Sequence, residues 1–181
     1  MHELVGDQKR MDEIQDLSLE DLLPKNRAKN IISIDLSNKT IMVTGAGGSI
    51  GSEIVRQALA SDPSELILVD FSESSLFKIY EETLALKKTY KSNAKISPIL
   101  HDISNTVSFG KIASKFKIDF IYHAAAYKHV PMLEISENIL NGIKNNIMGT
   151  NAICEIAKEQ NVKKVIMIST DKAVRPTNLM G

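Results

Sequence analysis

The chain has few of the features that mark extracellular, membrane-spanning or nucleic-acid-binding proteins. Its 181 residues include one cysteine, which excludes an internal disulfide and fits a reducing compartment. Lys and Arg together number 22, as do Asp and Glu, so no excess of positive charge indicates a nucleic-acid partner. No apolar run is long enough to cross a bilayer, and the N-terminus has no signal-peptide core. The four histidines show no metal-ligand spacing, so no metal site is predicted.

Hydrophobic and polar residues are distributed as in a globular α/β protein. Hydrophobic residues make up 43% and charged residues 24% of the chain. Residues 1–38 are predicted to form an N-terminal arm or linker with one capped helical turn at 18–23, and residues 39–181 one domain. Strands are predicted at 40–44, 65–70, 95–100, 118–123 and 163–169, and helices at 50–61, 73–90, 105–116 and 134–160.

The alternation of strands and helices predicts how the domain is arranged. It indicates a parallel sheet with right-handed crossovers and helices on both faces. We therefore expect a Rossmann-like, doubly wound α/β fold with the strand order 3-2-1-4-5. Ligands of such sheets bind at the carboxyl ends of the strands, near the switch between strands 1 and 4. The residues that follow each predicted strand are therefore the candidates for a site.

A glycine-rich turn follows the first predicted strand. It reads Gly45-Ala46-Gly47-Gly48-Ser49-Ile50-Gly51 and leads into a helical pattern. Glycine lets the backbone turn tightly and approach a ligand, and a helix N-terminus offers N–H donors and the positive end of a dipole. The order of strand, turn and helix predicts a diphosphate cradle, and a tight turn without a ligand is the alternative. Its candidate residues are Gly45, Gly47, Gly48, Ser49, Ile50 and Gly51.

An acidic residue ends the second predicted strand. Asp70 lies nineteen positions after Gly51, where a carboxylate can bond to the ribose hydroxyls of an adenine dinucleotide. None of the three residues after Asp70 is basic, and Asp70 with Glu73 would repel a 2′-phosphate. The sequence therefore favours NAD as the cofactor, with NADP as the alternative. Without a ligand, Asp70 would only cap a helix.

Three later segments are expected to meet the cofactor at the same edge of the sheet. The carboxylate after the third strand can accept a hydrogen bond from the adenine amino group or close a surface turn. Three alanines after the fourth strand leave room for a cofactor to pass over the backbone, or they begin a packed helix. An asparagine is a poor helix former within a predicted helix, so it bonds to backbone near the site or is solvated. These candidates are Asp102, Ile103, Ala124, Ala125, Ala126, Lys128 and Asn146.

The carboxyl end of the fifth predicted strand carries groups for acid–base chemistry. Ser169-Thr170-Asp171-Lys172 supplies hydroxyls, a carboxylate and an amine where this fold places catalytic groups. Ser169 is a candidate cofactor contact, and the other three residues are candidate catalytic groups. A capping Thr-Asp pair beside an exposed lysine is the alternative.

These segments together resemble a known family. The glycine turn at 45–51, the stretch 123–131 and the string 169–181 are similar to the nucleotide-sugar 4,6-dehydratases of extended short-chain dehydrogenase type, and more narrowly to CapD-like polysaccharide biosynthesis proteins. The resemblance covers about residues 17–181 and implies the N-terminal part of such an enzyme, without its sugar-nucleotide lobe. It also implies a UDP-N-acetylhexosamine substrate and a place on the cytoplasmic face of the membrane, anchored through a region absent from this chain.

The resemblance implies an elimination without net redox change. A hydride passes from sugar C4 to NAD, the ketone acidifies the C5 proton, and loss of that proton and of the C6 hydroxyl precedes return of the hydride to C6. On the family pattern Thr170 bonds to the C4 oxygen, Lys172 takes the C5 proton and Asp171 protonates the leaving hydroxyl. Lys172 must therefore have a lowered pKa and Asp171 a raised pKa when they act.

Met180 departs from the wider superfamily, whose members have tyrosine there and lysine four positions later. A thioether cannot exchange a proton, so Met180 is expected at the active site without an acid–base role. The membrane-bound subgroup is similar in having methionine here. The partner lysine would fall beyond the last residue of this chain, so we expect the 181 residues alone to bind NAD weakly and to turn over no sugar nucleotide.

Alternative functions stay open at this point. A 4-epimerase or reductase could use the same scaffold, and a non-catalytic module could bind the dinucleotide alone. Lys172 separates the first of these from a dehydratase, because an epimerase needs no base for C5. We also expect a homo-oligomer, because the fifth strand has an uncovered edge in this sequence.

Overall fold

The computed structural model describes residues 35–170, of which the part from Leu36 onward forms one compact unit. Five parallel strands form one sheet in the order β3-β2-β1-β4-β5, which confirms the predicted fold class and strand order. The predicted helical turn at 18–23, like most of the predicted arm, lies outside the described residues. The elements are β1 (Thr40–Thr44), α2 (Ser49–Ala60), β2 (Glu65–Asp70), α3 (Glu73–Tyr90), β3 (Lys95–Leu100), α4 (Thr106–Ala113), β4 (Phe120–His123), α5 (Val130–Leu133), α6 (Ser136–Ile143), the π-helix η3 (Lys144–Gly149), α7 (Thr150–Glu159) and β5 (Lys164–Met167).

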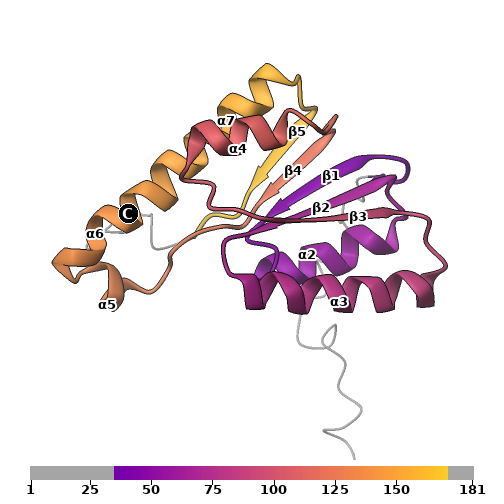
Figure 1. Cartoon of the computed structure of the whole chain (residues 1–181), viewed down its shortest axis with the longest axis horizontal. Helices are drawn as coiled ribbons and strands as arrows, with labels where there is room; N and C mark the ends of the chain where they lie inside the picture. The colour runs from indigo at the N-terminus through magenta and orange to yellow at the C-terminus, as the bar shows by residue number, and fades with distance from the viewer. Residues whose placement is uncertain (1–34, 171–181) are drawn as a thin grey trace, which may run out of the picture. The chain divides into compact units, whose positions relative to one another are not determined.

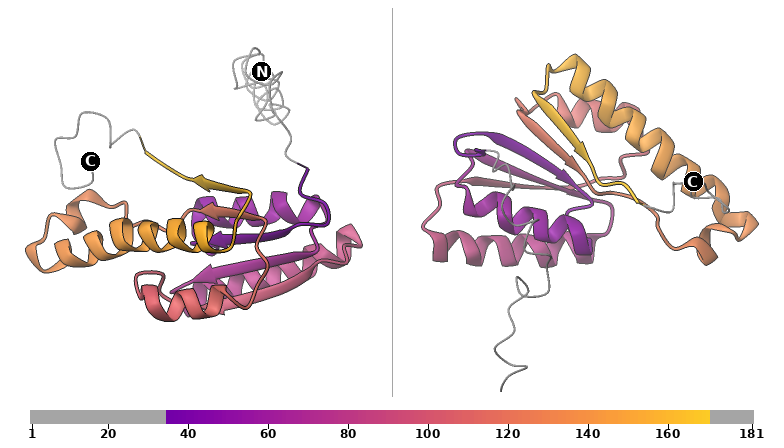
Figure 2. Two further views of the ribbon diagram at one scale, coloured as in Figure 1. Left: turned by 90° about the horizontal axis from the view of Figure 1, so that it is seen from above. Right: turned by 180° about the vertical axis from the view of Figure 1, so that it is seen from behind.

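Helices cover both faces of the sheet, as the two-sided burial of the strands requires. Helices α2 and α3 pack on one face, while α4 and α7 pack on the other, and the views in Figures 1 and 2 agree on this. Helices α5 and α6 extend beyond the carboxyl ends of the strands (Figure 1). This leaves the carboxyl edge of the sheet bordered by the loops that follow each strand.

The central strands are buried because they are apolar on both faces. In β1, residues 41–43 are completely buried, and in β2 the same holds for residues 66–69. Continuous apolar runs of this kind are typical of parallel strands between two helical layers. On the α4 and α7 side, Phe109 and Ile153 pack with Met42 and Ile67 in the main hydrophobic cluster.

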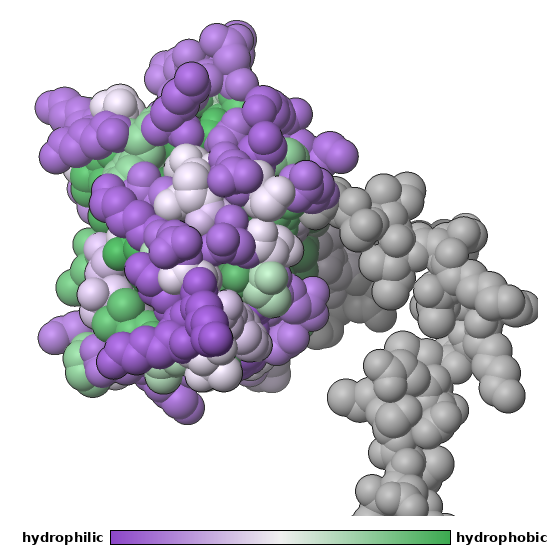
Figure 3. Space-filling model, turned by 90° about the vertical axis from the view of Figure 1, so that its right-hand side faces the viewer, coloured by the Kyte–Doolittle hydropathy of each residue, from purple (hydrophilic) through white to green (hydrophobic). Residues whose placement is uncertain are grey.

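The surface at the amino ends of the central strands is mostly hydrophilic. Figure 3 views the molecule from the side on which β1, β2 and β3 begin, and hydrophilic residues cover most of that face. Within residues 35–170, no helix combines the length and the apolar character that crossing a membrane requires. The features that bear on function lie at the carboxyl ends of the strands.

Several predicted boundaries in the second half of the chain were wrong. The single predicted helix 134–160 is divided into α6, η3 and α7, and a short α5 precedes it. The predicted helix 105–116 ends at Ala113, where the chain turns with hydrogen bonds from Lys115 and Phe116 back to residues 112 and 113. The fourth and fifth strands are four residues each, so both are shorter than predicted. The first three strands have their predicted bounds.

Candidate functional site

The turn between β1 and α2 is close-packed, and glycine is required at both of its ends. Gly45 has a φ of 67°, in the left-handed region, and a Cβ there would lie 2.7 Å from the backbone N of Ala125. A Cβ on Gly51 would overlap the carbonyl oxygen of Gly45. The turn is therefore folded tightly onto its own helix and against the loop after β4.

Helix α2 begins directly after Gly48 of the glycine turn. Gly48 is the N-cap and has no side chain to accept from the first N–H groups of the helix, which begins at Ser49. By helix geometry the N–H groups of the first turn lack intrahelical acceptors. They and the positive end of the helix dipole can hold an anionic group such as a diphosphate.

Asp70 is held in a fixed orientation at the carboxyl end of β2. Its side chain is 7% exposed, and its Oδ2 accepts a hydrogen bond of 2.9 Å from the backbone N–H of Gly47. Its Oδ1 accepts a second bond of 2.9 Å, from the N–H of Ser72, which is the N-cap of α3. The carboxylate thus joins the glycine turn to the start of α3 and stands beside both.

A hollow of about 320 Å³ lies where these elements meet. It brings together the residues that follow β1, β2, β3 and β4, as expected for a parallel sheet of this order. Of the fifteen predicted cofactor residues, eight line it and seven, including Ser169 beyond β5, do not. Those that line it are Gly45, Gly48, Asp70, Asp102, Ile103, Ala124, Ala125 and Ala126; those that do not are Gly47, Ser49, Ile50, Gly51, Lys128, Asn146 and Ser169.

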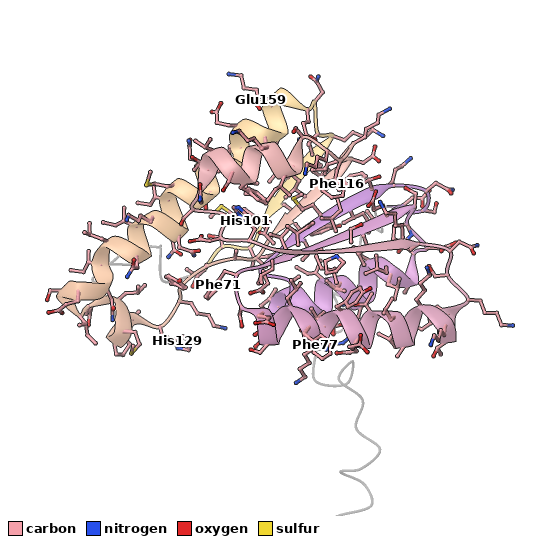
Figure 4. The ribbon with its side chains drawn as sticks, in the orientation of Figure 1. Phe71, Phe77, His101, Phe116, His129 and Glu159 are labelled. Carbon is pink, nitrogen blue, oxygen red and sulfur yellow. The ribbon has the colours of Figure 1, made fainter. Side chains whose placement is uncertain are left out.

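The segment after β3 forms one wall of the hollow. Asp102 Oδ1 accepts a hydrogen bond of 2.8 Å from the N–H of Ser104, which closes a turn and leaves Oδ2 for a ligand. His101 bonds through Nε2 to Ser108 Oγ at 2.8 Å, and its ring stacks on Phe109 at 5.6 Å between centroids. Figure 4 shows His101 below α4, at the edge where the strands end.

The π-helix η3 holds the loop after β4 through one amide side chain. Asn146 Oδ1 accepts from the N–H of Tyr127 at 2.8 Å, and Asn146 Nδ2 donates to the carbonyl of Tyr127 at 2.9 Å. Asn145, which lines the hollow, donates from Nδ2 to the same Asn146 Oδ1. The predicted bond from Asn146 to backbone is present, and we call this pair of bonds the Asn146 clamp.

His123 joins three elements behind the hollow. Its Nδ1 lies 2.7 Å from Thr44 Oγ1 of β1, and its Nε2 lies 2.9 Å from Thr150 Oγ1 of α7. Thr150 donates its own hydroxyl proton to the carbonyl of Asn146, so it accepts from His123 Nε2–H, and Thr44 donates to Nδ1. Burial lowers the pKa of His123, in agreement with this neutral ring.

The predicted catalytic segment is described only in part. Ser169 and Thr170 are exposed just beyond β5, while Asp171, Lys172 and Met180 lie outside the described residues. Lys128 lines a second hollow of about 360 Å³, which adjoins the first because Ala126 and Tyr127 line both. Lys128, which the sequence predicted as a cofactor contact, thus lines the neighbouring hollow and not the one that Asp70 lines.

Sequence reasoning missed several residues of the hollow. Phe71, Ser72 and Ser75 line it on one side, and Tyr127 and Asn145 on another. Position after a strand was the available signal for Phe71 and Tyr127, since both follow buried apolar runs. Nothing in the periodicity of the long predicted helix indicated that Asn145 would face the site.

The sequence matches a family model over most of its length. The model is that of the polysaccharide biosynthesis proteins, and it matches residues 41–181. The capsular polysaccharide biosynthesis protein CapD of Staphylococcus aureus is 41% identical over 100% of this chain and 30% of its own length. The probable polysaccharide biosynthesis protein EpsC of Bacillus subtilis is 39% identical over 93% of this chain and 28% of its own length. A UDP-glucose 4-epimerase of Rickettsia canadensis is 33% identical over 80% of this chain and 40% of its length.

Solved structures share the fold. Pen from Bacillus thuringiensis superposes with a TM-score of 0.71 and 29% identity, over 82% of this chain and 44% of that one. A UDP-glucose-4-epimerase from Stenotrophomonas maltophila, solved with NAD and formylated UDP-arabinopyranose, has a TM-score of 0.61 and 20% identity over 74% and 38% of the two chains. The chain therefore spans less than half the length of each of these proteins.

Proposed function

Because the chain belongs to the polysaccharide biosynthesis protein family, we propose that it forms the dinucleotide-binding part of an enzyme that modifies a nucleotide sugar. The observation that carries the proposal is the hollow at which the glycine turn, Asp70 and Asp102 converge. In this hollow a ribose would meet Asp70 and an adenine amino group would meet Asp102, while a diphosphate beside Gly45 and Gly48 would approach the first N–H groups of α2, just outside the lining. The donor set and the close backbone approach at the glycines fit an adenine dinucleotide.

The cofactor we propose is NAD rather than NADP. Asp70 is held by two backbone N–H groups, so its carboxylate cannot swing away from a ribose. A 2′-phosphate would be placed against this negative charge. In the intact protein we expect Asp70→Asn to weaken NAD binding and to narrow the preference over NADP by about tenfold, measured by calorimetry with both cofactors. An unchanged preference would contradict the assignment.

The reaction we propose is 4,6-dehydration of a UDP-N-acetylhexosamine for a surface polysaccharide. The bound dinucleotide would supply hydride transfer to and from the sugar. Thr170, exposed just beyond β5, would donate a hydrogen bond to the C4 oxygen. Lys172 would remove the C5 proton and Asp171 would protonate the departing C6 hydroxyl, while Met180 would exchange no proton.

Replacement of the proposed base tests the reaction class. In the intact protein, Lys172→Ala should retain NAD binding but form no product lighter by one water from UDP-N-acetylhexosamines, as followed by mass spectrometry. Lys158→Ala, which changes an exposed lysine of α7, is the matched control and should dehydrate the sugar at the wild-type rate. Dehydration by the Lys172 variant at an undiminished rate would remove this mechanism.

A 4-epimerase is the second candidate, supported by the 33% identity to the Rickettsia canadensis protein. Epimerisation at C4 leaves the C5 proton in place, whereas dehydration removes it. In heavy water, deuterium at C5 of the product therefore favours dehydration, and a C4 epimer without that label favours the alternative. Absence of any turnover by a protein that takes up NAD would favour a binding module. Self-association and attachment at the cytoplasmic face of a membrane stay predictions.

A further inference from the structure

An exposed aromatic ring lies at the edge of the hollow. Phe71 directly follows Asp70, is 60% exposed and lines the hollow. Figure 4 places Phe71 at the carboxyl end of the sheet, away from Phe77, which is another exposed phenylalanine and belongs to α3. Large exposed apolar rings at the rim of a hollow are often binding surfaces, because a ligand removes them from water.

The ring of Phe71 is held from across the hollow. The rings of Phe71 and Tyr127 meet edge to face, with 5.9 Å between centroids and an interplanar angle of 84°. β1 lies between β2 and β4 in the sheet, so this contact joins the loops of two strands that flank the glycine turn. We call these two rings the aromatic clasp.

One side of the clasp is anchored by hydrogen bonds. The Asn146 clamp takes both the N–H and the carbonyl of Tyr127, so the backbone that carries this ring is fixed. The other side is fixed through Asp70, whose Oδ1 accepts from the N–H of Ser72 next to Phe71. The edge contact therefore limits the rotation of Phe71 before any ligand arrives, and a ligand that packs on the ring orders little more.

The position of Phe71 selects which part of a ligand it can cover. Asp70, Phe71, Asp102 and Ile103 line the same hollow, so the base attached to a ribose at Asp70 would occupy the space that Phe71 borders, between Asp70 and the wall formed by Asp102 and Ile103. The only flat apolar part of such a ligand near Phe71 is that base, because the diphosphate belongs to the N-terminus of α2. Stacking of a base on an aromatic side chain is worth about tenfold or more in affinity.

We propose that Phe71, steadied by Tyr127, is a binding residue for the adenine of the dinucleotide. The inference rests on the proposed function, because it assumes that the hollow takes an adenine dinucleotide. It adds a residue that determines affinity for the base, separate from the carboxylate that binds the ribose. The two rings hold adenine at the position from which the diphosphate reaches α2.

Ligand binding to single-site variants of the intact protein tests the proposal. Phe71→Ala should weaken the binding of both NAD and ADP by about tenfold in calorimetry, since ADP carries the base without the nicotinamide. Phe71→Leu, which keeps apolar bulk but has no flat ring, should weaken both to a similar degree. Phe77→Ala is the matched control, because Phe77 is 65% exposed but does not line the hollow, and should bind both ligands as the wild type does.

The outcomes separate this inference from the proposed function. Wild-type affinity of the folded Phe71→Ala or Phe71→Leu protein for ADP would overturn the role of Phe71 and leave dinucleotide binding intact. Equal losses in the Phe77 control would overturn it as well, because the effect would then not belong to the hollow. A wild-type protein that takes up neither NAD nor ADP would overturn the proposed function, and this inference with it.

Discussion

The two halves of the sheet are built differently. In β1 and β2, residues 41–43 and 66–69 are completely buried. In β5, by contrast, no residue is buried, and Met167 is 55% exposed. Large hydrophobic side chains are also exposed along the helices of the second half. They are Met132, Ile135, Leu140, Ile143, Ile147 and Met148. The central strands of the half that carries the glycine turn are thus buried on both faces, while the last strand of the half that leads to the predicted catalytic segment is not. Exposed apolar side chains occur in both halves, since Ile50, Phe71 and Phe77 of the first half are also exposed.

The two halves also differ in the hydrogen bonds that hold the residues of the proposed site in place. In the first half, the glycine turn and the start of α3 are joined by the carboxylate of Asp70, which lies at the end of a buried strand. In the second half, the loop after β4 depends on an amide from η3, nineteen residues further along the chain. Substitutions in the two halves should therefore have different effects on binding and on stability.

The largest effect is expected at the glycine turn. A Cβ on Gly51 would overlap the carbonyl oxygen of Gly45, which is backbone and cannot move without opening the turn. We expect Gly51→Ala to lower the free energy of unfolding by about 3 kcal/mol and to abolish NAD binding. Urea unfolding and calorimetry measure the two losses.

Gly110 provides the matched control for that substitution. It lies in α4, and a Cβ there would meet nothing within 4 Å. Gly110→Ala should therefore raise the free energy of unfolding by about 0.5–1 kcal/mol and leave NAD binding unchanged. A Gly51→Ala protein that is as stable as this control would show that the turn is not close-packed.

The Asn146 clamp should produce the next largest effect. Asn146→Ala leaves the N–H and the carbonyl of Tyr127 without their partner, which should cost about 1–2 kcal/mol of unfolding free energy and weaken NAD binding several-fold. Asn151→Ala, at an exposed position of α7, is the control and should change neither. Equal stability of the two variants would show that the clamp contributes nothing to the second half.

The same contrast explains what could be predicted from sequence. Strands β1, β2 and β3 and helix α3 have the predicted bounds, because long apolar runs and a stable period settle them locally. The single helix predicted over 134–160 was wrong because η3 is set by tertiary contacts. Asn146 reaches Tyr127, and Gly149 packs against Ile103 so closely that a Cβ would lie 2.9 Å from its Cδ1. Neither contact leaves a periodic signal.

The residues of the candidate site also differ in how well the sequence indicated them. Gly45, Gly48 and Asp70 were recognisable because turn chemistry and strand ends fix their places within one crossover. The contact between Phe71 and Tyr127 was not recognisable, because the two residues are 56 positions apart and neither segment alone indicates it. The sequence therefore indicated the residues that we propose for the diphosphate and the ribose, but not the aromatic ring that we propose for the base.

His123 of β4 bonds to Thr44 of β1 and to Thr150 of α7, so it lies between the two halves. We expect it to make the free energy of unfolding depend on pH. Burial lowers its pKa in the folded protein, so its neutral ring stabilises the fold above the unfolded pKa of about 6.5. That contribution is lost as pH falls below about 6.5 toward the lower folded pKa, because only the unfolded chain then binds the proton. Urea unfolding between pH 7.5 and 5.5 should show this loss, and His123→Gln should make the slope shallower. Parallel slopes for the two proteins would contradict the assignment.

The smallest effect is expected from the ion pair on the surface of the first half. Arg56 of α2 donates from Nε to Glu82 of α3 at 2.6 Å, and both side chains are 35% exposed. Exposed pairs of this kind are screened by water and salt, so Arg56→Met should lower the free energy of unfolding by only ~0.5 kcal/mol and leave NAD binding unchanged. The loss should shrink further in high salt. If Arg56→Met instead matched the loss from Gly51→Ala, the stability of this half would come from its surface charges and not from its buried strands and close-packed turn.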